Sequence, residues 1–159
     1  MCNKNKTLDL VELDKKTSFD EITGYIDRLY LELFGHDEVL TSDVKHKIHQ
    51  QWQDTNPSHW AYKVLNDGNV VAFFTLVESF SFFAHGQYGI INEFWVAPES
   101  RSQGVGGQVL QLIKTLAVQK GWERIDVSAP IAEEWIRSVD FYKKYGFNST
   151  GKKLKYIAE

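Results

Sequence analysis

The sequence predicts an α/β domain with a mixed, mostly antiparallel central sheet flanked by helices. Segments of alternating apolar and polar residues are interspersed with segments whose apolar residues recur at the spacing of an α-helix. A hairpin signal lies near the middle of the chain, and a glycine-rich turn further on joins a predicted strand to a predicted helix. No repeat, low-complexity tract or linker interrupts the 159 residues, so we expect one domain over residues 1–159.

The first part of the chain predicts one strand and two helices. Residues 7–13 alternate apolar and polar side chains, as a half-buried strand does. Ser18 followed by Glu21 predicts a capping box, and the apolar residues after it recur at helical spacing. A second helix with a narrow apolar face is expected to start near residues 41–42 and to end before Pro57.

The middle of the chain predicts three strands. Residues 60–65 and 70–77 flank the turn sequence Asn-Asp-Gly-Asn, which predicts a hairpin. The second of these strands is apolar on both faces and is expected to be central in the sheet. An aromatic loop over residues 79–87 and a third strand over residues 88–96 are expected next.

The last part of the chain predicts alternating helices and strands. Apolar residues over 105–117 predict an amphipathic helix that Gly121 ends. A short strand over residues 124–129, a helix over 132–145 and a final strand over 153–157 are expected after it.

Charge is distributed unevenly along the sequence. Residues 1–100 carry 8 Lys+Arg against 15 Asp+Glu, whereas residues 101–159 carry 10 against 6. A basic half favours an anionic ligand and an acidic half a cationic one, although solvated surface charge explains the same numbers. Clustered basic residues typical of a nucleic-acid binder are absent from the sequence, so we expect no nucleic-acid partner.

The sequence also bears on location and on metal binding. No apolar run reaches the roughly 18 residues that a membrane span needs, and the first ten residues lack the apolar stretch of a signal peptide. Cys2 is the only cysteine, and the five histidines are scattered. We therefore expect a cytoplasmic protein without a metal site or a membrane partner.

The glycine-rich turn is the feature that predicts chemistry. It comprises Arg101, Ser102, Gln103, Gly104, Val105, Gly106 and Gly107. A helix N-terminus presents unpaired backbone N–H groups and partial positive charge, and glycines let a phosphate approach them. The spacing fits neither a dinucleotide-binding fingerprint nor a Walker A loop. A tight turn with close helix packing is the structural alternative.

Two motifs in order give a family resemblance. Arg101, Gly104 and Gly106 match the Arg/Gln-x-x-Gly-x-Gly/Ala signature of the GCN5-related N-acetyltransferase superfamily, and residues 141–147, Phe-Tyr-Lys-Lys-Tyr-Gly-Phe, resemble its Phe-Tyr-x-x-x-Gly-Phe segment. The similar order of elements extends the resemblance over residues 7–157. It implies the acyl-CoA N-acyltransferase fold with acetyl-CoA as donor.

The resemblance also implies where the donor binds. The backbone of Phe94, Trp95 and Val96 is expected to pair with the pantetheine arm, and residues 102–107 to enclose the pyrophosphate. The strands over 88–96 and 124–129 are expected to separate there. The chain departs from the family pattern at Trp135, where relatives often have Asn, and at Ser138, where they often have Ala.

Acetyl transfer needs a neutral amine, an oxyanion stabiliser and a proton for the thiolate. By the resemblance, Tyr142 is the acid beside the cofactor sulfur and Glu93 faces the acceptor as a base. Core packing is the alternative for Tyr142. For Glu93 the alternatives are a solvent-facing position or acceptor binding without proton transfer. His85 is the reserve base, and Tyr145 is expected to pack.

The expected reaction is acetyl transfer to a primary amine of a small cationic molecule, such as a polyamine, amino sugar or aminoglycoside. A peptide or protein N-acetyltransferase and a catalytically idle acyl-CoA-binding module are the alternatives. The first two helices and residues 79–87 are expected to line the acceptor site, although the aromatic rings of that loop also suit capping of the core. An aromatic content of 14% permits a homodimer interface.

Overall fold

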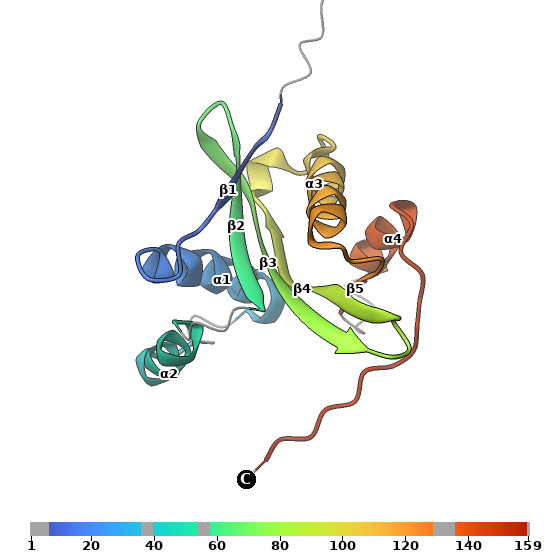
Figure 1. Ribbon diagram of the computed structural model, residues 1–159. Coiled ribbons are helices and arrows are strands. Elements are labelled where there is room, and N and C mark those ends of the chain that lie inside the picture. Colours follow the sequence, from blue (N-terminus) through green and yellow to red (C-terminus); the bar gives the residue numbers. More distant parts are fainter. Residues whose placement is uncertain (1–6, 36–39, 54–57, 129–135, 159) are drawn as a thin grey trace, which may run out of the picture. The chain divides into compact units, whose positions relative to one another are not determined.

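The computed structural model describes residues 7–35, 40–53, 58–128 and 136–158. The chain forms two compact units, residues 1–126 and residues 127–159. In the described part, five strands form one sheet in the order β1-β2-β3-β4-β5 (Figure 1). The expected α/β fold with a mostly antiparallel sheet is confirmed.

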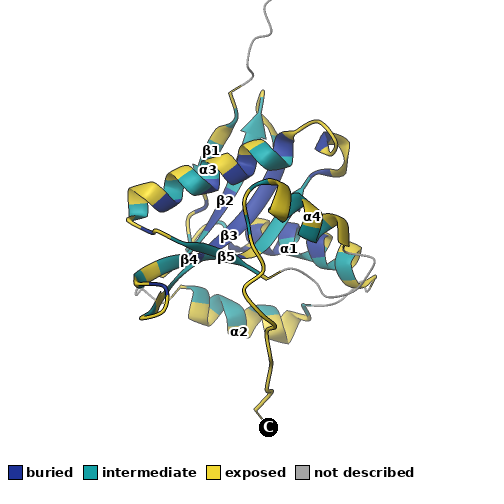
Figure 2. Ribbon diagram, turned by 90° about the vertical axis from the view of Figure 1, so that its right-hand side faces the viewer, coloured by how far each residue is buried: buried dark blue, intermediate teal, exposed yellow. Residues whose placement is uncertain are grey.

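Antiparallel pairing joins the first four strands in chain order. The strands are β1 (Asp9–Glu12), β2 (His59–Asn66), β3 (Asn69–Ser81), β4 (Gly86–Val96) and β5 (Ile125–Val127). Asp67 and Gly68, both with positive φ (50° and 80°), form the two-residue turn between β2 and β3, as the Asp-Gly sequence predicts. β3 is central and largely buried, also as expected (Figure 2).

The helices of the first unit cover both faces of the sheet (Figure 1). They are α1 (Phe19–Phe34), α2 (Ser42–Trp52) and α3 (Val105–Lys120), and a 3-10 turn (Pro98–Ser100) precedes α3. On the α1 face, Tyr25 stacks on Phe73 with ring centroids 5.0 Å apart, and Trp95 packs in the same buried cluster. This core fixes α1 against β4.

The predicted capping box of α1 is wrong. Ser18 is the N-cap residue, but its side chain makes no cap hydrogen bond. Glu21 instead accepts hydrogen bonds from Lys63 Nζ (2.7 Å) and from the Tyr25 hydroxyl (3.0 Å). In the bond to Lys63 on β2 both partners are charged, and this ion pair takes the place of the capping interaction.

The aromatic segment is a hairpin and not a loop. β3 extends to Ser81 and β4 begins at Gly86, so only the tip is outside the strands. Phe80, Phe82 and Phe83 are 62%, 91% and 85% exposed at this tip. The alternative that these rings cap the core is therefore wrong.

The second unit contains α4 (Ile136–Lys144) and an extended C-terminal segment. Residues 151–158 have no regular structure and are exposed, so the predicted strand over residues 153–157 is wrong. Its alternating pattern suits a strand, but a strand forms only by pairing with a neighbour, and no described strand pairs with it. Ala129, Trp135 and the predicted start of the helix at residue 132 lie outside the described residues.

Candidate active site

A β-bulge on β4 sets the geometry of the site. Phe74 pairs with Phe94 while Leu76 pairs with Ile91, so β4 carries one residue more than β3 across this step. Asn92 and Glu93 are the residues between these pairs. A bulge bends the strand and changes the direction in which its side chains point.

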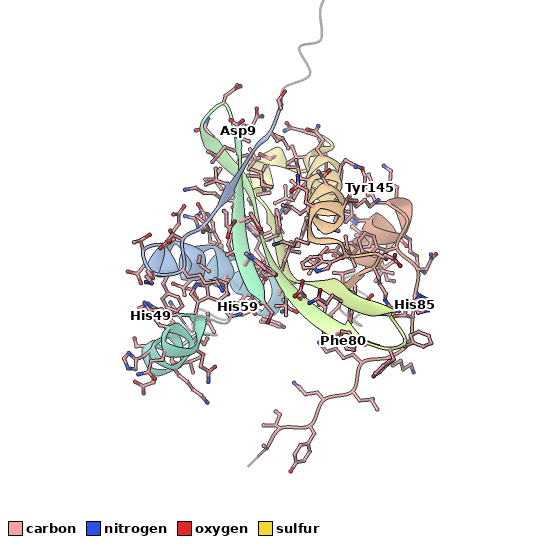
Figure 3. The ribbon with its side chains drawn as sticks, in the orientation of Figure 1. Asp9, His49, His59, Phe80, His85 and Tyr145 are labelled. Atoms are coloured by element: carbon pink, nitrogen blue, oxygen red, sulfur yellow. The ribbon has the colours of Figure 1, made fainter. Side chains whose placement is uncertain are left out.

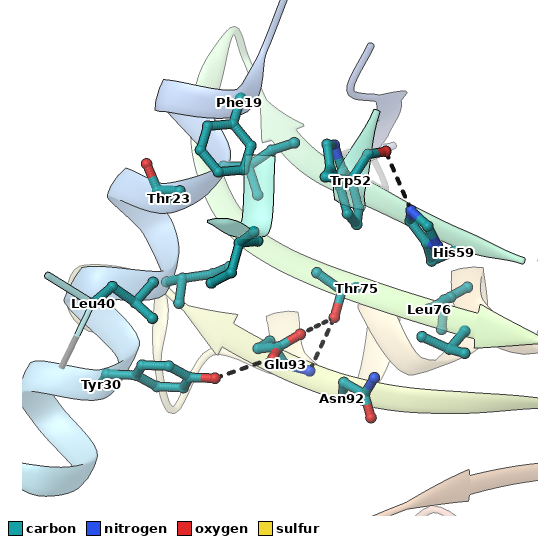
Figure 4. Close-up of a pocket in the computed structure, with 14 residues that line it drawn as sticks. Phe19, Thr23, Tyr30, Leu40, Trp52, His59, Thr75, Leu76, Asn92 and Glu93 are labelled. Atoms are coloured by element: carbon teal, nitrogen blue, oxygen red, sulfur yellow. Dashed lines mark hydrogen bonds between the residues drawn. The ribbon is translucent and has the colours of Figure 1, made fainter. Parts of the chain in front are cut away.

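Three hydrogen bonds hold the Glu93 carboxylate and backbone (Figure 4). The hydroxyl of Tyr30 on α1 donates to Glu93 Oε1 at 3.2 Å, and the hydroxyl of Thr75 on β3 donates to Oε2. The backbone N–H of Glu93 donates to Thr75 Oγ1 at 3.2 Å. Burial first, and then the charge of Glu93, raises the pKa of Tyr30 to about 12, so this phenol stays a donor.

Glu93 has no cationic partner among the described residues. The ion pairs there are Lys45 with Asp27, Lys63 with Glu21, Arg101 with Glu32, and Arg124 with Asp126. Both donors to Glu93 are neutral hydroxyl groups. Neutral donors orient the carboxylate but leave its negative charge without a cationic partner in the described part of the chain. A positively charged ammonium group can pair with it.

A cavity of about 180 Å³ opens in front of Glu93, within the first unit. It is lined by α1, α2 and the strands β2, β3 and β4, and its walls are mostly apolar and aromatic (Figure 4). Both helices that were expected beside the acceptor line this cavity. Residues 79–87, the other expected wall, do not line it.

The glycine turn has the backbone of an anion cradle. Ser102 and Gly104 have positive φ (60° and 79°), and Gly104 is the N-cap residue of α3. The first backbone bond into this helix runs from Gln108 N to Gly104 O (3.2 Å), so the N–H groups of residues 105–107 have no acceptor within the helix. A Cβ placed on Gly104 would meet no heavy atom within 4 Å, so the space beside the turn is open.

Arg101 makes its contacts with the protein itself. Its Nε donates to the carbonyl of Val96 at 2.9 Å, and its Nη2 pairs with Glu32 at 2.6 Å. Glu32 also accepts from Trp95 Nε1 at 3.1 Å. Gln103 likewise bonds inward, from Nε2 to Glu99 O at 2.8 Å. Glu32 was not among the residues predicted from the sequence, because no local pattern links it to a turn 69 residues away.

The segment expected to bind pantetheine lies at the end of β4. Trp95 is buried against α1, which leaves its backbone and not its ring for a ligand. The hydrogen bond from Gly89 N to Arg124 O (3.0 Å) joins β4 to the start of β5 at the opposite end of β4. β5 ends at Val127, whereas β4 continues to Val96. This arrangement supports the expected separation of the two strands.

Tyr142 belongs to the second unit. Its ring makes edge contacts with Phe141 (5.3 Å) and Phe147 (5.5 Å), and burial raises its pKa to about 12. Tyr145 contacts Phe141 in the same cluster (5.2 Å), which agrees with the expected packing role. His85, the reserve base, is exposed at the tip of the β3–β4 hairpin with φ of 62° (Figure 3). It does not line the cavity to which Glu93 belongs.

The described residues contain neither a metal-binding cluster nor a membrane-spanning helix. No group of three or more His, Cys, Asp or Glu side chains in that part of the chain is arranged to hold a metal ion. None of its helices is both long and apolar enough to cross a membrane.

The sheet, the bulged strand and the glycine turn before α3 together define an acyltransferase-type α/β fold. The chain matches the acetyltransferase (GNAT) family over residues 19–147 and belongs to that family. It is thus related to enzymes that transfer acyl groups. No curated protein matches the sequence.

Solved structures of similar fold share little sequence with this chain. One is an aminoglycoside acetyltransferase from an uncultured soil metagenomic sample in complex with sisomicin (14% identity, 96% of this chain and 95% of that one, TM-score 0.71). A possible acetyltransferase from Clostridium difficile 630 has 16% identity, coverage of 96% and 97%, and a TM-score of 0.75. A ribosomal-protein-alanine N-acetyltransferase from Brucella melitensis biovar Abortus 2308 has 15% identity, coverage of 96% and 99%, and a TM-score of 0.66. These identities establish the shared fold only.

Proposed function

We propose that the protein is an acetyl-CoA-dependent N-acetyltransferase that moves the acetyl group from CoA directly to a primary amine of a small cationic molecule. One observation carries the proposal: Glu93 is an oriented carboxylate without a cationic partner among the described residues, and it faces a cavity. Family membership supplies the reaction class, and the metagenomic relative solved with sisomicin is an example of an acetyltransferase with a small amine.

The donor side is proposed at the glycine turn. The free N–H groups at the start of α3 and the open space at Gly104 suit the pyrophosphate of acetyl-CoA. The backbone of residues 94–96 would pair with the pantetheine arm, which places the thioester toward the bulge. A backbone N–H near Val96 would polarise the thioester carbonyl.

The acceptor side is proposed at Glu93. Its carboxylate binds the ammonium form of the amine and accepts a proton from it, directly or through water. The neutral nitrogen then attacks the thioester carbonyl carbon. The C–N bond forms, the C–S bond breaks, and the acylated nitrogen gives up a second proton that balances the one the thiolate takes. The products are the N-acetyl amine, CoA thiol and the proton held by Glu93.

Tyr142 is proposed to donate to the departing thiolate. Because burial raises its pKa to about 12, the phenol stays protonated throughout the physiological range. Its matched position in the Phe-Tyr-x-x-x-Gly-Phe segment supports this role.

Titration calorimetry with acetyl-CoA tests the donor site. We expect a Kd on the order of micromolar for the wild type and loss of binding in Gly104→Trp, where the indole fills the open side of the turn. Gly121→Trp is the matched control, because Gly121 ends the same helix with a similar φ (75°) and equally open surroundings. A folded wild-type protein without affinity for acetyl-CoA would refute the proposal.

Thiol release with a panel of amines tests the transfer step. Turnover of a small amine supports the proposed acceptor. Turnover with peptides alone would favour a peptide N-acetyltransferase, and donor binding without turnover of any acceptor would favour an idle acyl-CoA-binding module.

A further inference from the structure

The cavity in front of Glu93 has fixed aromatic walls. The rings of Trp52 and His59 lie 4.5 Å apart, and His59 Nε2 lies 3.4 Å from the carbonyl oxygen of Trp52. Phe19 stacks on His49 with centroids 4.3 Å apart. Contacts between neighbouring rings restrict both walls, so the apolar shape of the cavity is largely preformed.

A single carboxylate lies in the described part of the cavity wall. Among the described residues that line it, Glu93 is the one with a carboxylate, and none is a lysine or an arginine. Glu93 can pair with one ammonium group. A second ammonium group on the same ligand would lie against apolar side chains such as Ile48 and Leu76 without a counter-ion, and burial of an unpaired charge is strongly unfavourable.

The size of the cavity limits the rest of the ligand. An apolar cavity of about 150 Å³ holds a benzene ring, and this one measures about 180 Å³. A single ring or a short branched alkyl chain therefore fits between α1 and α2 with its amino group toward Glu93. We propose that the acceptor is a monoamine with an apolar body, of the arylalkylamine or branched alkylamine class, and not a polycation. This inference rests on the proposed function and narrows its substrate.

Calorimetric titration of the full chain with three probes tests the preference without depending on acetyl transfer. The probes are 2-phenylethylamine, spermidine and 2-phenylethanol. We expect 2-phenylethylamine to bind at least about tenfold more tightly than the other two, since spermidine buries unpaired charge and the alcohol leaves Glu93 unpaired. Equal or tighter binding of spermidine would overturn the inference.

A second carboxylate in the wall should reverse the preference. Ile48→Glu places it on the cavity side of α2, where Ile48 is only partly buried. We expect spermidine to gain at least about tenfold in affinity relative to 2-phenylethylamine. Val44→Glu is the matched control, because Val44 is exposed one turn earlier on the same helix and does not line the cavity. An unchanged preference in folded Ile48→Glu protein would overturn the inference.

Failure of the proposed function has a different signature. In that case either acetyl-CoA would not bind, or it would bind and no amine would be acetylated, whatever the affinities of the three probes. If acetyl-CoA binds and spermidine is acetylated with a higher kcat/KM than 2-phenylethylamine, the proposed function stands and the monoamine inference alone is refuted.

Discussion

Arg101 and Glu32 form an ion pair of 2.6 Å that joins the glycine turn to the last turn of α1. The same carboxylate accepts a hydrogen bond from Trp95, so it also contacts β4. Because both charged side chains are partly exposed, the pair itself contributes at most about 1 kcal/mol to stability. Its effect is geometric: the helix that carries Tyr30 into the acceptor cavity also braces the proposed donor site.

Arg101→Ala should weaken acetyl-CoA binding about fivefold. The substitution removes the hydrogen bond to the Val96 carbonyl and the ion pair with Glu32. The turn is then less ordered without ligand, and ordering it when acetyl-CoA binds costs on the order of 1 kcal/mol more. Lys45→Ala is the control, since it breaks an ion pair of equal length between α2 and Asp27 on α1, away from the turn. Calorimetry with acetyl-CoA measures both, and equal affinities would contradict a bracing role.

Tyr142→Phe should lower kcat by about 10²–10⁴ while the Kd for acetyl-CoA changes by less than about twofold, since only the proton donor is lost. Tyr145→Phe makes the same change one residue beyond the end of that helix and should retain kcat. Steady-state thiol release and calorimetry separate the two parameters. A Tyr142→Phe enzyme with normal kcat would leave the ring with a packing role only.

Tyr30→Phe should lower kcat/KM for the amine about tenfold, mainly through KM. Without the phenol, Glu93 loses one of its two side-chain donors and is less well oriented toward the ammonium group. Tyr25→Phe removes a hydroxyl from the same helix that bonds to Glu21 (3.0 Å) outside the cavity, and we expect its kcat/KM to stay near wild type. If both variants behave alike, the contact between Tyr30 and Glu93 has no role in acceptor binding.

Local signals in the sequence predicted most of the elements. Glycines beyond helix ends, helical spacing of apolar residues and the Asp-Gly turn act over a few residues, so α1, α2, α3 and the β2–β3 hairpin were predicted within a few residues of their ends. The glycine turn was predicted for the same reason.

Contacts across the sheet could not be predicted in this way. Tyr30 and Glu93 are 63 residues apart, and Lys63 binds Glu21 across 42 residues. The contact between Lys63 and Glu21 replaces the predicted capping box. The contact between Tyr30 and Glu93 orients the candidate base. The β4 bulge depends on the register with β3, which an alternating pattern on one strand does not specify.

Alkaline pH should destabilise the fold through Tyr62. Burial first, and then the charge of Glu12, raises the pKa of Tyr62 to about 12, compared with about 10 in an unfolded chain. Below pH 10 both states keep the proton. Between pH 10 and 12 only the unfolded chain loses it, so the free energy of unfolding falls as pH rises.

Tyr62→Phe should reduce the alkaline fall in the free energy of unfolding by on the order of 2 kcal/mol. Phenylalanine has no hydroxyl proton to lose when the chain is unfolded. Tyr156→Phe is the control, since Tyr156 is 88% exposed and should keep the wild-type pH dependence. Urea denaturation at pH 9 and at pH 11.5 measures the difference. Identical losses in the two variants would contradict the assignment to Tyr62.

Gly89→Ala should lower the free energy of unfolding by about 1–3 kcal/mol. A Cβ on Gly89 would overlap Cε3 and Cζ3 of Trp122, whose Nε1 is held by Glu78 at 2.7 Å, so the indole cannot move aside freely. Gly24→Ala is the matched control: no atom lies within 4 Å of its Cβ, and alanine in a helix interior should add about 0.5–1 kcal/mol. Urea denaturation of both variants measures these opposite signs. A neutral Gly89→Ala would show that the indole shifts at little cost, and that the close approach of β4 to Trp122 does not require glycine.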